Sequence, residues 1–385
     1  MRILILNYEF PPLGGGAGNA TQYLLREFAK RPDFSFDLVT SSADAFRIEQ
    51  FSPNIMIHFL DIGKKGNLYY QRNKDLLKYS WKAYWYCKKL IKARRQVSDV
   101  RGQLSNVTLV HAFFGIPCGY IAMKLGVPYI VSLRGSDVPF YNRRFYWLDK
   151  LIFRRLSRRI WRRAKAVIAN SEGLKELALK TAPVQVISII PNGVDVQQFC
   201  PANSGHRKSL GTYDVLNIIS TGRLIERKGY AYLLLALEGL HNVELTLVGD
   251  GPLRVELEQL AKKNNVKVNF VGNIAHDKII PYLQEADVFV LPSLNEGMSN
   301  AILEAMACGL PIIATDTGGS RELVRENGMI VPKADAPALR MAIEKLVHHP
   351  DLRKTMGAAS RQRAEQMNWE TVAQEYLRVY ESTKS

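Results

Sequence analysis

Short hydrophobic runs alternate with amphipathic segments along the whole chain. The runs are rich in Ile, Leu and Val and end at polar or glycine residues, so they predict buried strands. In the first half we expect strands near residues 2–8, 36–41, 55–61, 107–113, 129–133, 166–170 and 186–190. In the second half we expect them near 216–222, 243–248, 268–272, 287–291, 311–315 and 328–331. The clearest helices are predicted over 18–30, 72–95, 144–164, 229–238, 252–263 and 300–308. This alternation is typical of parallel α/β sheets.

The segment FCPANSGHRKSLGTYD, residues 199–214, is polar and rich in Pro, Gly, Ser and Asn, which predicts an interdomain linker. A chain of 385 residues is long enough for two domains, each with its own core. We expect an N-terminal domain over residues 1–195 and a C-terminal domain over 196–367, both doubly wound. Such sheets bind ligands at the carboxyl ends of their strands, so a cleft between the domains is the expected active site.

Composition is that of an ordered protein, with 47% hydrophobic and 23% charged residues. The longest stretch without formal charge, residues 103–123, contains Asn, His and Pro and predicts strand–turn–helix rather than a membrane span. The first apolar run is too short for a signal-peptide core. Four scattered cysteines without a C-x-x-C motif indicate reduced thiols in a cytosolic protein, and neither a metal site nor a disulfide.

The net charge of +16 is concentrated in the first half. Residues 1–195 hold 31 Lys and Arg against 14 Asp and Glu, whereas residues 196–385 hold 21 against 22. Aromatic residues are interleaved with lysines over 69–95, and six arginines occur as three adjacent pairs between 154 and 163. We expect this basic half to bind an anionic membrane surface. A solvated face is the alternative, and no nucleic acid is expected because no binding-module pattern occurs.

Two turns after predicted strands suit phosphates. PPLGGGAGNA (11–20) opens the first helix, where backbone N–H groups can approach a phosphate. It lacks the third glycine of a dinucleotide fingerprint and the Gly-Lys-Ser/Thr of a P-loop, so a plain flexible turn is an equal alternative. STGRLIERKGY (220–230) places Arg223 and Lys228 across a strand–helix turn, which suits a diphosphate; solvated surface charges are the ordinary alternative.

Other strand ends carry weaker signals. VGDGP (248–252) and FVGNI (270–274) are glycine turns of a kind common in α/β folds. VHAFFG ends a strand with His111, and a single histidine there is more often a hydrogen-bonded core residue. LRGSDV places Arg134 and Asp137 on the next exit loop, where they could form a salt bridge with each other.

Two acids stand out in NEGMSNAILEAMACGLP (295–311), because the predicted helix 300–308 is otherwise small or apolar. Glu304 lies within this helix and Glu296 lies in the loop before it. A carboxylate on a buried helix normally has a partner. Both acids can accept hydrogen bonds from sugar hydroxyls, and we favour this interpretation. A buried salt bridge and a glycosidase acid–nucleophile pair are the alternatives.

The spacing Glu296, seven residues, Glu304 resembles the E-x7-E signature of the retaining glycosyltransferases of family four, which have the GT-B fold. This fold consists of two Rossmann-like doubly wound domains that face each other across a cleft. The closing helix in this family packs on the first domain, so we expect residues 368–385 to join it. The similarity also includes the N-terminal Gly-rich loop, PNGVD (191–195), GRLIERKG, LVGDGP, VFVLPS, GGSRELV (318–324) and NWETVAQEYLRVY (368–380).

The resemblance implies a role for each matching residue. Glu304 would hold the ribose hydroxyls of a nucleotide sugar and Glu296 the C3 and C4 hydroxyls of its sugar. Arg223 and Lys228 would neutralise the diphosphate, and His111 would lie beside the donor sugar at the reaction centre. Backbone contacts to the donor would come from Gly15, Gly16, Gly297, Met298 and Ser299. The candidate acceptor contacts are Arg134 and Asp137, although many relatives carry His where Arg134 stands.

We therefore predict a retaining glycosyltransferase that uses a UDP- or GDP-sugar and acts on a hydroxyl of a glycan or lipid-linked acceptor, in cell-surface polysaccharide or glycolipid synthesis. The leaving phosphate would accept the acceptor's proton. No Asp-x-Asp motif occurs, so no metal or other obligatory cofactor is expected. The expected location is cytoplasmic, peripheral on the inner face of the plasma membrane. The alternatives are a nucleotide-sugar 2-epimerase of the same architecture and a non-enzymatic basic protein that binds membrane or RNA.

Overall fold

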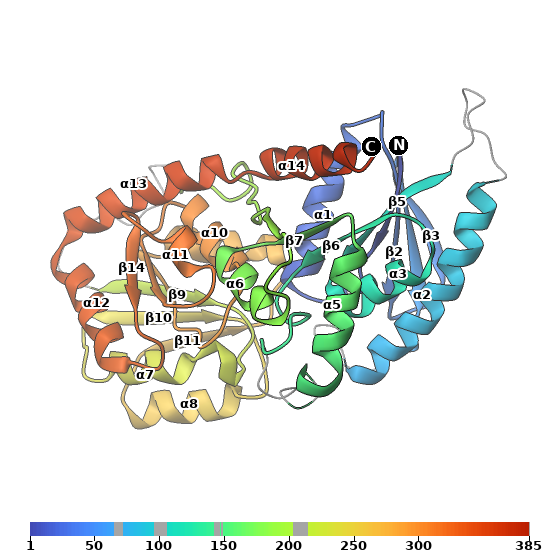
Figure 1. Ribbon diagram of the computed structural model, residues 1–385. Helices are drawn as coiled ribbons and strands as arrows, with labels where there is room; N and C mark the ends of the chain where they lie inside the picture. The colour runs from blue at the N-terminus through green and yellow to red at the C-terminus, as the bar shows by residue number, and fades with distance from the viewer. Residues whose placement is uncertain (65–71, 96–105, 142–146, 148, 203–214, 385) are drawn as a thin grey trace. The chain divides into compact units, whose positions relative to one another are not determined.

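The computed structural model describes residues 1–64, 72–95, 106–141, 147, 149–202 and 215–384 (Figure 1). The chain forms two compact units. Unit 1 comprises Met1–Asn192 together with Trp369–Ser385, and unit 2 comprises Gly193–Asn368. Each unit has its own buried hydrophobic core.

Unit 1 contains an eight-stranded sheet in the order β3-β4-β2-β1-β5-β6-β7-β8. All neighbouring strands are parallel except β3 and β4. The strand order reverses between β1 and β5, so the carboxyl ends of these two strands form the expected ligand crevice of the unit. The strands are β1 (Arg2–Leu6), β2 (Ser35–Ser42), β3 (Arg47–Ser52), β4 (Ile55–Asp61), β5 (Val107–Phe113), β6 (Tyr129–Leu133), β7 (Ala166–Ala169) and β8 (Ser188–Ile189).

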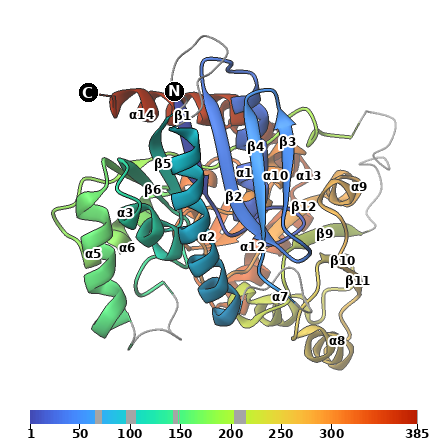
Figure 2. The ribbon, with the colours of Figure 1, turned by 90° about the vertical axis from the view of Figure 1, so that its right-hand side faces the viewer.

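Helices cover both faces of this sheet. Helices α1 and α14 pack against each other on one face, while α2, α3 and α5 contact in series on the other (Figures 1 and 2). The last helix, α14, is fixed by aromatic contacts: Trp369 stacks on Tyr23 at 5.6 Å between ring centroids, and Tyr380 is fully buried. The helices are α1 (Gly16–Ala29), α2 (Asn73–Arg94), α3 (Tyr120–Lys124), α5 (Arg154–Arg163), α6 (Glu172–Thr181) and α14 (Trp369–Ser382).

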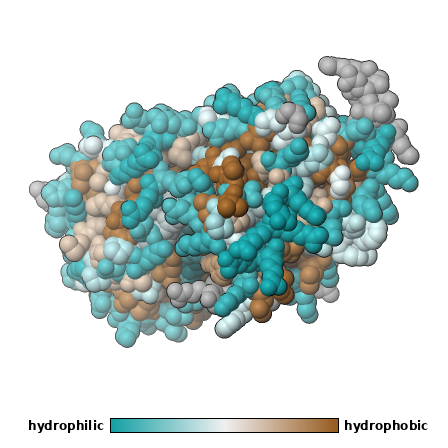
Figure 3. All heavy atoms as spheres, in the orientation of Figure 1, coloured by the Kyte–Doolittle hydropathy of each residue, from teal (hydrophilic) through white to brown (hydrophobic). Residues whose placement is uncertain are grey.

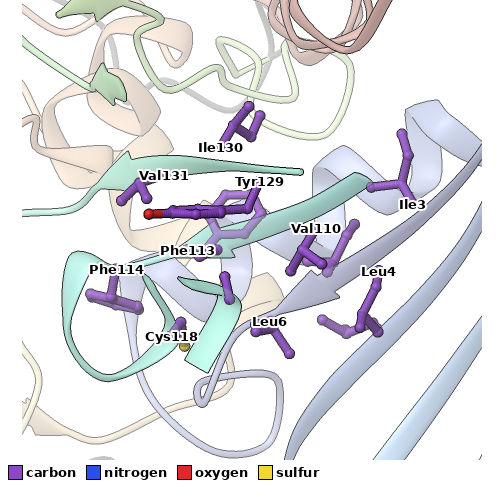
Figure 4. Close-up of a cluster of buried hydrophobic side chains, with 14 of the residues drawn as sticks. Ile3, Leu4, Leu6, Val110, Phe113, Phe114, Cys118, Tyr129, Ile130 and Val131 are labelled. Carbon is purple, nitrogen blue, oxygen red and sulfur yellow. The ribbon is translucent and has the colours of Figure 1, made fainter. Parts of the chain in front are cut away.

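The core of unit 1 explains why its central strands lack polar alternation. Figure 4 shows Leu4 and Leu6 of β1, Val110 and Phe113 of β5 and Val131 of β6 among the buried side chains. A parallel sheet covered by helices buries both faces of its strands, so near-continuous apolar runs result.

Unit 2 contains a six-stranded parallel sheet in the order β11-β10-β9-β12-β13-β14, which reverses between β9 and β12. Helix α12 packs on α7, and α10 packs on α13. The strands are β9 (Leu216–Thr221), β10 (Val243–Val248), β11 (Val268–Gly272), β12 (Val288–Leu291), β13 (Ile312–Thr315) and β14 (Gly328–Val331). The helices are α7 (Tyr230–Leu237), α8 (Arg254–Lys263), α9 (Ile280–Glu285), α10 (Asn300–Ala307), α11 (Ser320–Leu323), α12 (Ala336–His348) and α13 (Pro350–Gln366).

The predicted fold class of two doubly wound α/β sheets is confirmed, and each predicted strand is present. One strand, β3, was missed because its exposed polar residues hide the pattern; it lies at the sheet edge and runs antiparallel. The predicted linker begins too early, since Phe199 is buried in the core of unit 2. Linker residues 203–214, and residues 144–146 and 148 of the predicted helix 144–164, lie outside the described residues. Within the described residues, no helix combines the length and apolar character that a membrane crossing needs.

Candidate active site

The strongest cluster of predicted residues lies where the strand order of unit 2 reverses. Lys228 ends the short turn Glu226–Lys228 after β9, and Glu296 lies in the loop after β12. The Lys228 Nζ lies 2.5 Å from Glu296 Oε1, and Ser293 Oγ donates to the same oxygen at 2.9 Å. The structure therefore brings Lys228 and Glu296 into a direct ion pair at the sheet's crevice.

Glu296 is held as an anion although it is buried. Burial alone would raise the pKa of this carboxyl, but the charges of Lys228 and Arg227 outweigh burial and leave the pKa below its ordinary value. Arg227 Nη1 lies 3.8 Å from Glu296 Oε2 and also donates to the carbonyl of Asn295 at 3.2 Å. Arg227 was not predicted; its place beside Lys228 in ERKG was the signal that could have identified it.

Arg223, which follows β9, differs from Lys228 in its exposure and its contacts. It is exposed, and among the described residues none forms a hydrogen bond or ion pair with its guanidinium. Gly222, just before it, has φ +145°, and a Cβ there would lie 3.2 Å from Cε of Lys228. The glycine thus lets the Lys228 side chain pass close to the end of β9, while Arg223 keeps its donors available to a ligand.

Glycines allow the strand-end loops of unit 2 to pack backbone on backbone. A Cβ at any of four glycines would lie within 2.4 Å of a carbonyl oxygen on a neighbouring loop, which no real side chain tolerates. VGDGP therefore has the structural role that was its ordinary interpretation. The four contacts are Gly229 with Pro292, Gly249 with Gly222, Gly251 with Leu224 and Gly319 with Gly297.

Glu304 has a protein partner, His276. The two side chains meet at 2.8 Å between Nε2 of His276 and Oε1 of Glu304, and both are largely buried. His276 begins the turn after β11 and its ring also contacts Phe199. Sequence reasoning missed His276, although it follows a strand at the edge where a ligand is expected.

Three buried residues precede the first turn of α10. Gly297, Met298 and Ser299 are all buried, and Ser299 Oγ accepts the backbone N–H of Ile302 at 3.4 Å as the helix cap. Glu304 follows in the second turn of the same helix. The loop thus joins Glu296 to Glu304 through a fixed backbone segment.

In unit 1 the glycine loop after β1 closes over a carboxylate. Gly15 N–H donates to Glu9 Oε2 at 3.3 Å, and a Cβ at Gly14 would lie 2.6 Å from Cβ of Glu9. Gly16 begins α1, and a Cβ at Gly15 would meet nothing within 4 Å. The side of the loop at Gly15 is therefore not covered by other atoms. Glu9, which was not predicted, accepts the Gly15 N–H that a bound phosphate would accept.

His111 lies in the core of unit 1. It is fully buried on β5, with Nδ1 at 2.7 Å from Tyr380 Oη and Nε2 at 2.8 Å from Ser132 Oγ. Burial holds its pKa well below the ordinary value, and the charge of Arg134 lowers it further. The ring is neutral and has no exposed atoms, so it links α14 to β6 as a hydrogen-bonded core residue.

Arg134 and Asp137 follow β6 but do not form a salt bridge with each other. Asp137 is buried and accepts backbone N–H groups from Gly115 at 2.6 Å and from Arg134 and Gly135 at 2.9 Å. Burial raises its pKa, and these bonds oppose the rise. The Arg134 guanidinium instead reaches Asn192. Asp137 thus fixes the backbone of the loop after β6, and the Arg134 guanidinium donates to Asn192 rather than to Asp137.

Two domain families match the sequence. Residues 14–198 match the family described as Glycosyltransferase Family 4, and residues 216–349 match Glycosyl transferases group 1. The putative teichuronic acid biosynthesis glycosyltransferase TuaC of Bacillus subtilis is 32% identical over 250 residues, covering 62% of this chain and 61% of TuaC. The GDP-mannose-dependent monoacylated alpha-(1-6)-phosphatidylinositol monomannoside mannosyltransferase of Corynebacterium glutamicum is 33% identical over 211 residues, covering 50% of this chain and 55% of the relative. The matched segments thus span little more than half of each relative.

A solved structure similar to this one is sucrose-phosphate synthase from Thermosynechococcus elongatus. The TM-score is 0.83 at 24% identity, with 99% of this chain and 98% of that chain covered. At this identity the likeness shows the fold alone, and the fold is the predicted GT-B fold of two Rossmann-like domains.

Proposed function

We propose that this chain, which belongs to the glycosyltransferases of family four, transfers a sugar from a nucleotide-diphosphate sugar to an acceptor hydroxyl with retention of anomeric configuration. The observation that carries the proposal is the contact of Lys228 and Arg227 with the ionised Glu296 at the crevice of unit 2. Cations suit a diphosphate, and an anionic carboxylate accepts hydrogen bonds from sugar hydroxyls. The names of both relatives as glycosyltransferases favour transfer over the 2-epimerase alternative.

The donor roles follow from the chemistry of each group. Lys228 and the unpaired Arg223 bind the diphosphate, and Glu296 accepts the sugar hydroxyls. Glu304, fixed by His276, accepts the ribose hydroxyls, because a carboxylate oriented by one partner keeps acceptor capacity on its other oxygen. Gly297, Met298 and Ser299 support the sugar and phosphates through their backbone. The backbone of Gly15 and Gly16 contributes to phosphate binding from unit 1, where a Cβ at Gly15 would meet nothing within 4 Å.

In the proposed reaction the bond between the anomeric carbon and the phosphate oxygen breaks as the acceptor oxygen bonds to the same carbon. The leaving phosphate takes the acceptor's proton. Lys228 and Arg223 stabilise the negative charge that develops on the phosphate, which is the largest contribution a preorganised site makes to such a step. His111 enters as a positioning residue, since both ring nitrogens already hold Tyr380 and Ser132.

The identity of the substrates is proposed from the relatives. One relative is named as GDP-mannose-dependent and acting on a phosphatidylinositol monomannoside, and the other as a teichuronic acid biosynthesis enzyme. We propose a UDP- or GDP-sugar donor and a glycan or lipid-linked acceptor in cell-surface polysaccharide or glycolipid synthesis.

The donor site is tested by thermal shift with UDP, GDP and their sugars. We expect one nucleotide to raise the Tm of the wild type, because a ligand that binds the native state stabilises it by mass action. Glu304→Ala should abolish this shift, whereas Glu256→Ala, an exposed carboxylate on α8, should keep it. The proposal fails if no nucleotide shifts the wild type at millimolar concentration. NMR of the product's anomeric proton tests retention, and conversion of the donor without acceptor would identify an epimerase.

We also propose that the face of unit 1 formed by α2, α3 and α5 binds the anionic inner surface of the plasma membrane. Within the described residues, no carboxylate pairs with any of the six arginines of α5. Figure 3 shows the hydrophilic surface over this helix. Apolar side chains accompany the charges: Trp81, Trp85 and Leu77 on α2 and Leu151, Ile152 and Trp147 next to α5 are exposed. Cationic and aromatic side chains together suit an anionic lipid surface.

Sedimentation with vesicles tests this surface. The protein should pellet with vesicles of phosphatidylcholine and phosphatidylglycerol, and less with phosphatidylcholine alone or at high salt, because salt screens exposed charges. A triple variant, Arg155→Gln, Arg159→Gln and Arg162→Gln, should lose most binding. The control changes Lys262, Lys263 and Lys278 of unit 2 to Gln. Equal loss in both variants, or equal binding to neutral vesicles, would contradict the assignment.

A further inference from the structure

In the part of the chain that the structure describes, the guanidinium of Arg134 is held by neutral groups. Its Nη1 donates to Asn192 Oδ1 at 2.8 Å, and its Nη2 donates to Tyr376 Oη at 3.3 Å. The guanidinium carbon lies 4.5 Å from the centroid of the Phe113 ring, a cation–π contact. No carboxylate of the described residues pairs with it, since Asp137 spends its oxygens on backbone N–H groups.

This arrangement fixes a cation without neutralising it. The side chain is partly buried, and its Nε is buried without a hydrogen-bond partner. A buried charge that lacks a counter-ion is costly, so proteins normally pair it. Each terminal nitrogen of a guanidinium carries two N–H donors, and each here spends one on the protein. One donor on each terminal nitrogen remains for a ligand.

A chain of buried side chains sets the position of this cation. Tyr376 Oη also receives Ser132 Oγ at 3.3 Å, and Ser132 in turn contacts His111, which contacts Tyr380. Tyr376 and Tyr380 both come from α14, and Ser132 comes from β6. Buried side chains from β5, β6 and α14 therefore fix the orientation of the Arg134 guanidinium.

The position also suits a substrate. Arg134 directly follows β6, next to β5 at the reversal of strand order in unit 1, where α/β sheets bind ligands. We propose that Arg134 recognises an anionic group of the acceptor, a phosphate or a carboxylate, and that the acceptor class is therefore acidic. This inference rests on the proposed transferase function. A guanidinium binds planar or tetrahedral oxyanions through paired, charge-assisted N–H donors, whereas the hydroxyls of a neutral glycan accept hydrogen bonds but supply no counter-charge.

Binding of paired probes tests the acceptor class. Glucose, glucose 6-phosphate, glucuronic acid and short-chain phosphatidylglycerol below its micelle concentration are titrated into the full-length protein in the presence of the nucleotide. We expect one acidic probe to bind roughly 10- to 100-fold more tightly than glucose, the range of a charge-assisted hydrogen-bond pair. The sugar phosphate, the carboxylate and the lipid headgroup are distinguished by which probe shows the preference. Equal affinity for all probes would overturn the inference.

Variants assign the preference to Arg134. Arg134→Gln should remove it and Arg134→Lys should keep part of it, whereas Arg26→Gln, an exposed arginine on α1 of unit 1, should leave it unchanged. If the Arg134 variants do not fold, phenylglyoxal modification of the wild type replaces them: the preferred probe should protect Arg134, as measured by peptide mass spectrometry. If the preference for an acidic probe persists in Arg134→Gln, or if the preferred probe does not protect Arg134 from modification, the assignment would be overturned.

The two proposals fail separately. A nucleotide-induced Tm shift belongs to unit 2 and should persist in Arg134→Gln. If the shift is present but no probe depends on Arg134, only the acidic-acceptor inference fails. If the wild type shows no nucleotide shift, the transferase proposal itself fails, whatever the probes do.

Discussion

The two sheets carry charge differently at the carboxyl ends of their strands, near the reversal of strand order. In unit 2, Lys228 and Arg227 lie 2.5 and 3.8 Å from the oxygens of Glu296, so the two cations share one carboxylate as their counter-ion. In unit 1, Arg134 is bound by Asn192 and Tyr376 and, among the described residues, has no counter-ion. The cations of unit 2 thus have a counter-ion within the protein, whereas the cation of unit 1 has none among the described residues.

This difference indicates how each crevice responds to a ligand. A cluster that contains its own counter-ion needs no ligand to pair its charges, and a donor that enters must exchange hydrogen bonds with Lys228 and Glu296. A fixed, unpaired cation needs no exchange and gains its counter-ion from the ligand. Substitutions should therefore cost stability in unit 2 through electrostatics, and in unit 1 through lost hydrogen bonds.

The largest expected effect comes from unbalancing the cluster with Lys228→Met. Glu296 would then be a buried carboxylate with only the longer contact to Arg227, so we expect a loss of about 3 kcal/mol in the free energy of unfolding. Adding Glu296→Gln should restore most of the loss, measured by urea denaturation as a double-mutant cycle. Arg134→Met, which removes no charge pair, should cost only about 1 kcal/mol. Additive effects in the cycle would show that the pair is not coupled.

A slightly smaller effect is expected from His111→Phe in the network behind Arg134. The substitution leaves Tyr380 Oη without its partner and weakens Ser132, and buried unsatisfied groups cost about 1 to 3 kcal/mol. We expect unfolding to become about 2 kcal/mol easier. Tyr380→Phe, the matched control, removes one hydroxyl and should cost about half as much. Equal stability of wild type and His111→Phe would show that the network does not hold α14.

Buried strands and isolated acids are features that could be predicted from the sequence. Periodicity predicted the strands, because central parallel strands are apolar throughout and stand out against their turns. It failed at β3, whose half-buried Arg47 and exposed Glu49 and Gln50 look like a loop. The sequence also indicated that the two acids need partners, and the structure gives them protein partners, Lys228 for Glu296 and His276 for Glu304. Their interaction with sugar hydroxyls stays a prediction.

Partners at long range were not predictable. Glu304 meets His276, and Arg134 meets Asn192 and Tyr376, which lie 58 and 242 positions away along the chain. Local sequence also does not show burial of a single side chain, so His111 had two interpretations before the structure showed it in the core. Glu9 was missed because its place under the glycine loop depends on the fold of the turn.

The pH dependence of stability separates the two units further. The pKa of His111 is held well below its ordinary value of about 6.5. Because the unfolded chain binds this proton and the folded protein does not, stability is complete above about pH 6.5 and falls with decreasing pH, by about 1.4 kcal/mol per pH unit until the folded pKa is reached. In His111→Asn the titrating ring is absent, so the free energy of unfolding of the variant should lack this decrease with falling pH. The lowered pKa of Glu296 acts only at more acidic pH, since its stabilisation is lost as that carboxyl is protonated.

The smallest expected effect concerns Glu9, the carboxylate under the glycine loop of unit 1. Its Oε2 accepts the N–H of Gly15 at 3.3 Å, an exposed bond that a phosphate would have to replace. Glu9→Gln removes the negative charge but keeps an acceptor, so affinity for a nucleotide diphosphate should rise about threefold, within the range of exposed charge effects. Isothermal titration of UDP and GDP measures this, with Glu27→Gln on α1 as the control. The gain should shrink at high salt, because the repulsion that it relieves is screened. An unchanged affinity would mean that the loop binds no phosphate, and the donor phosphates would then be bound by the cluster of unit 2 without the loop.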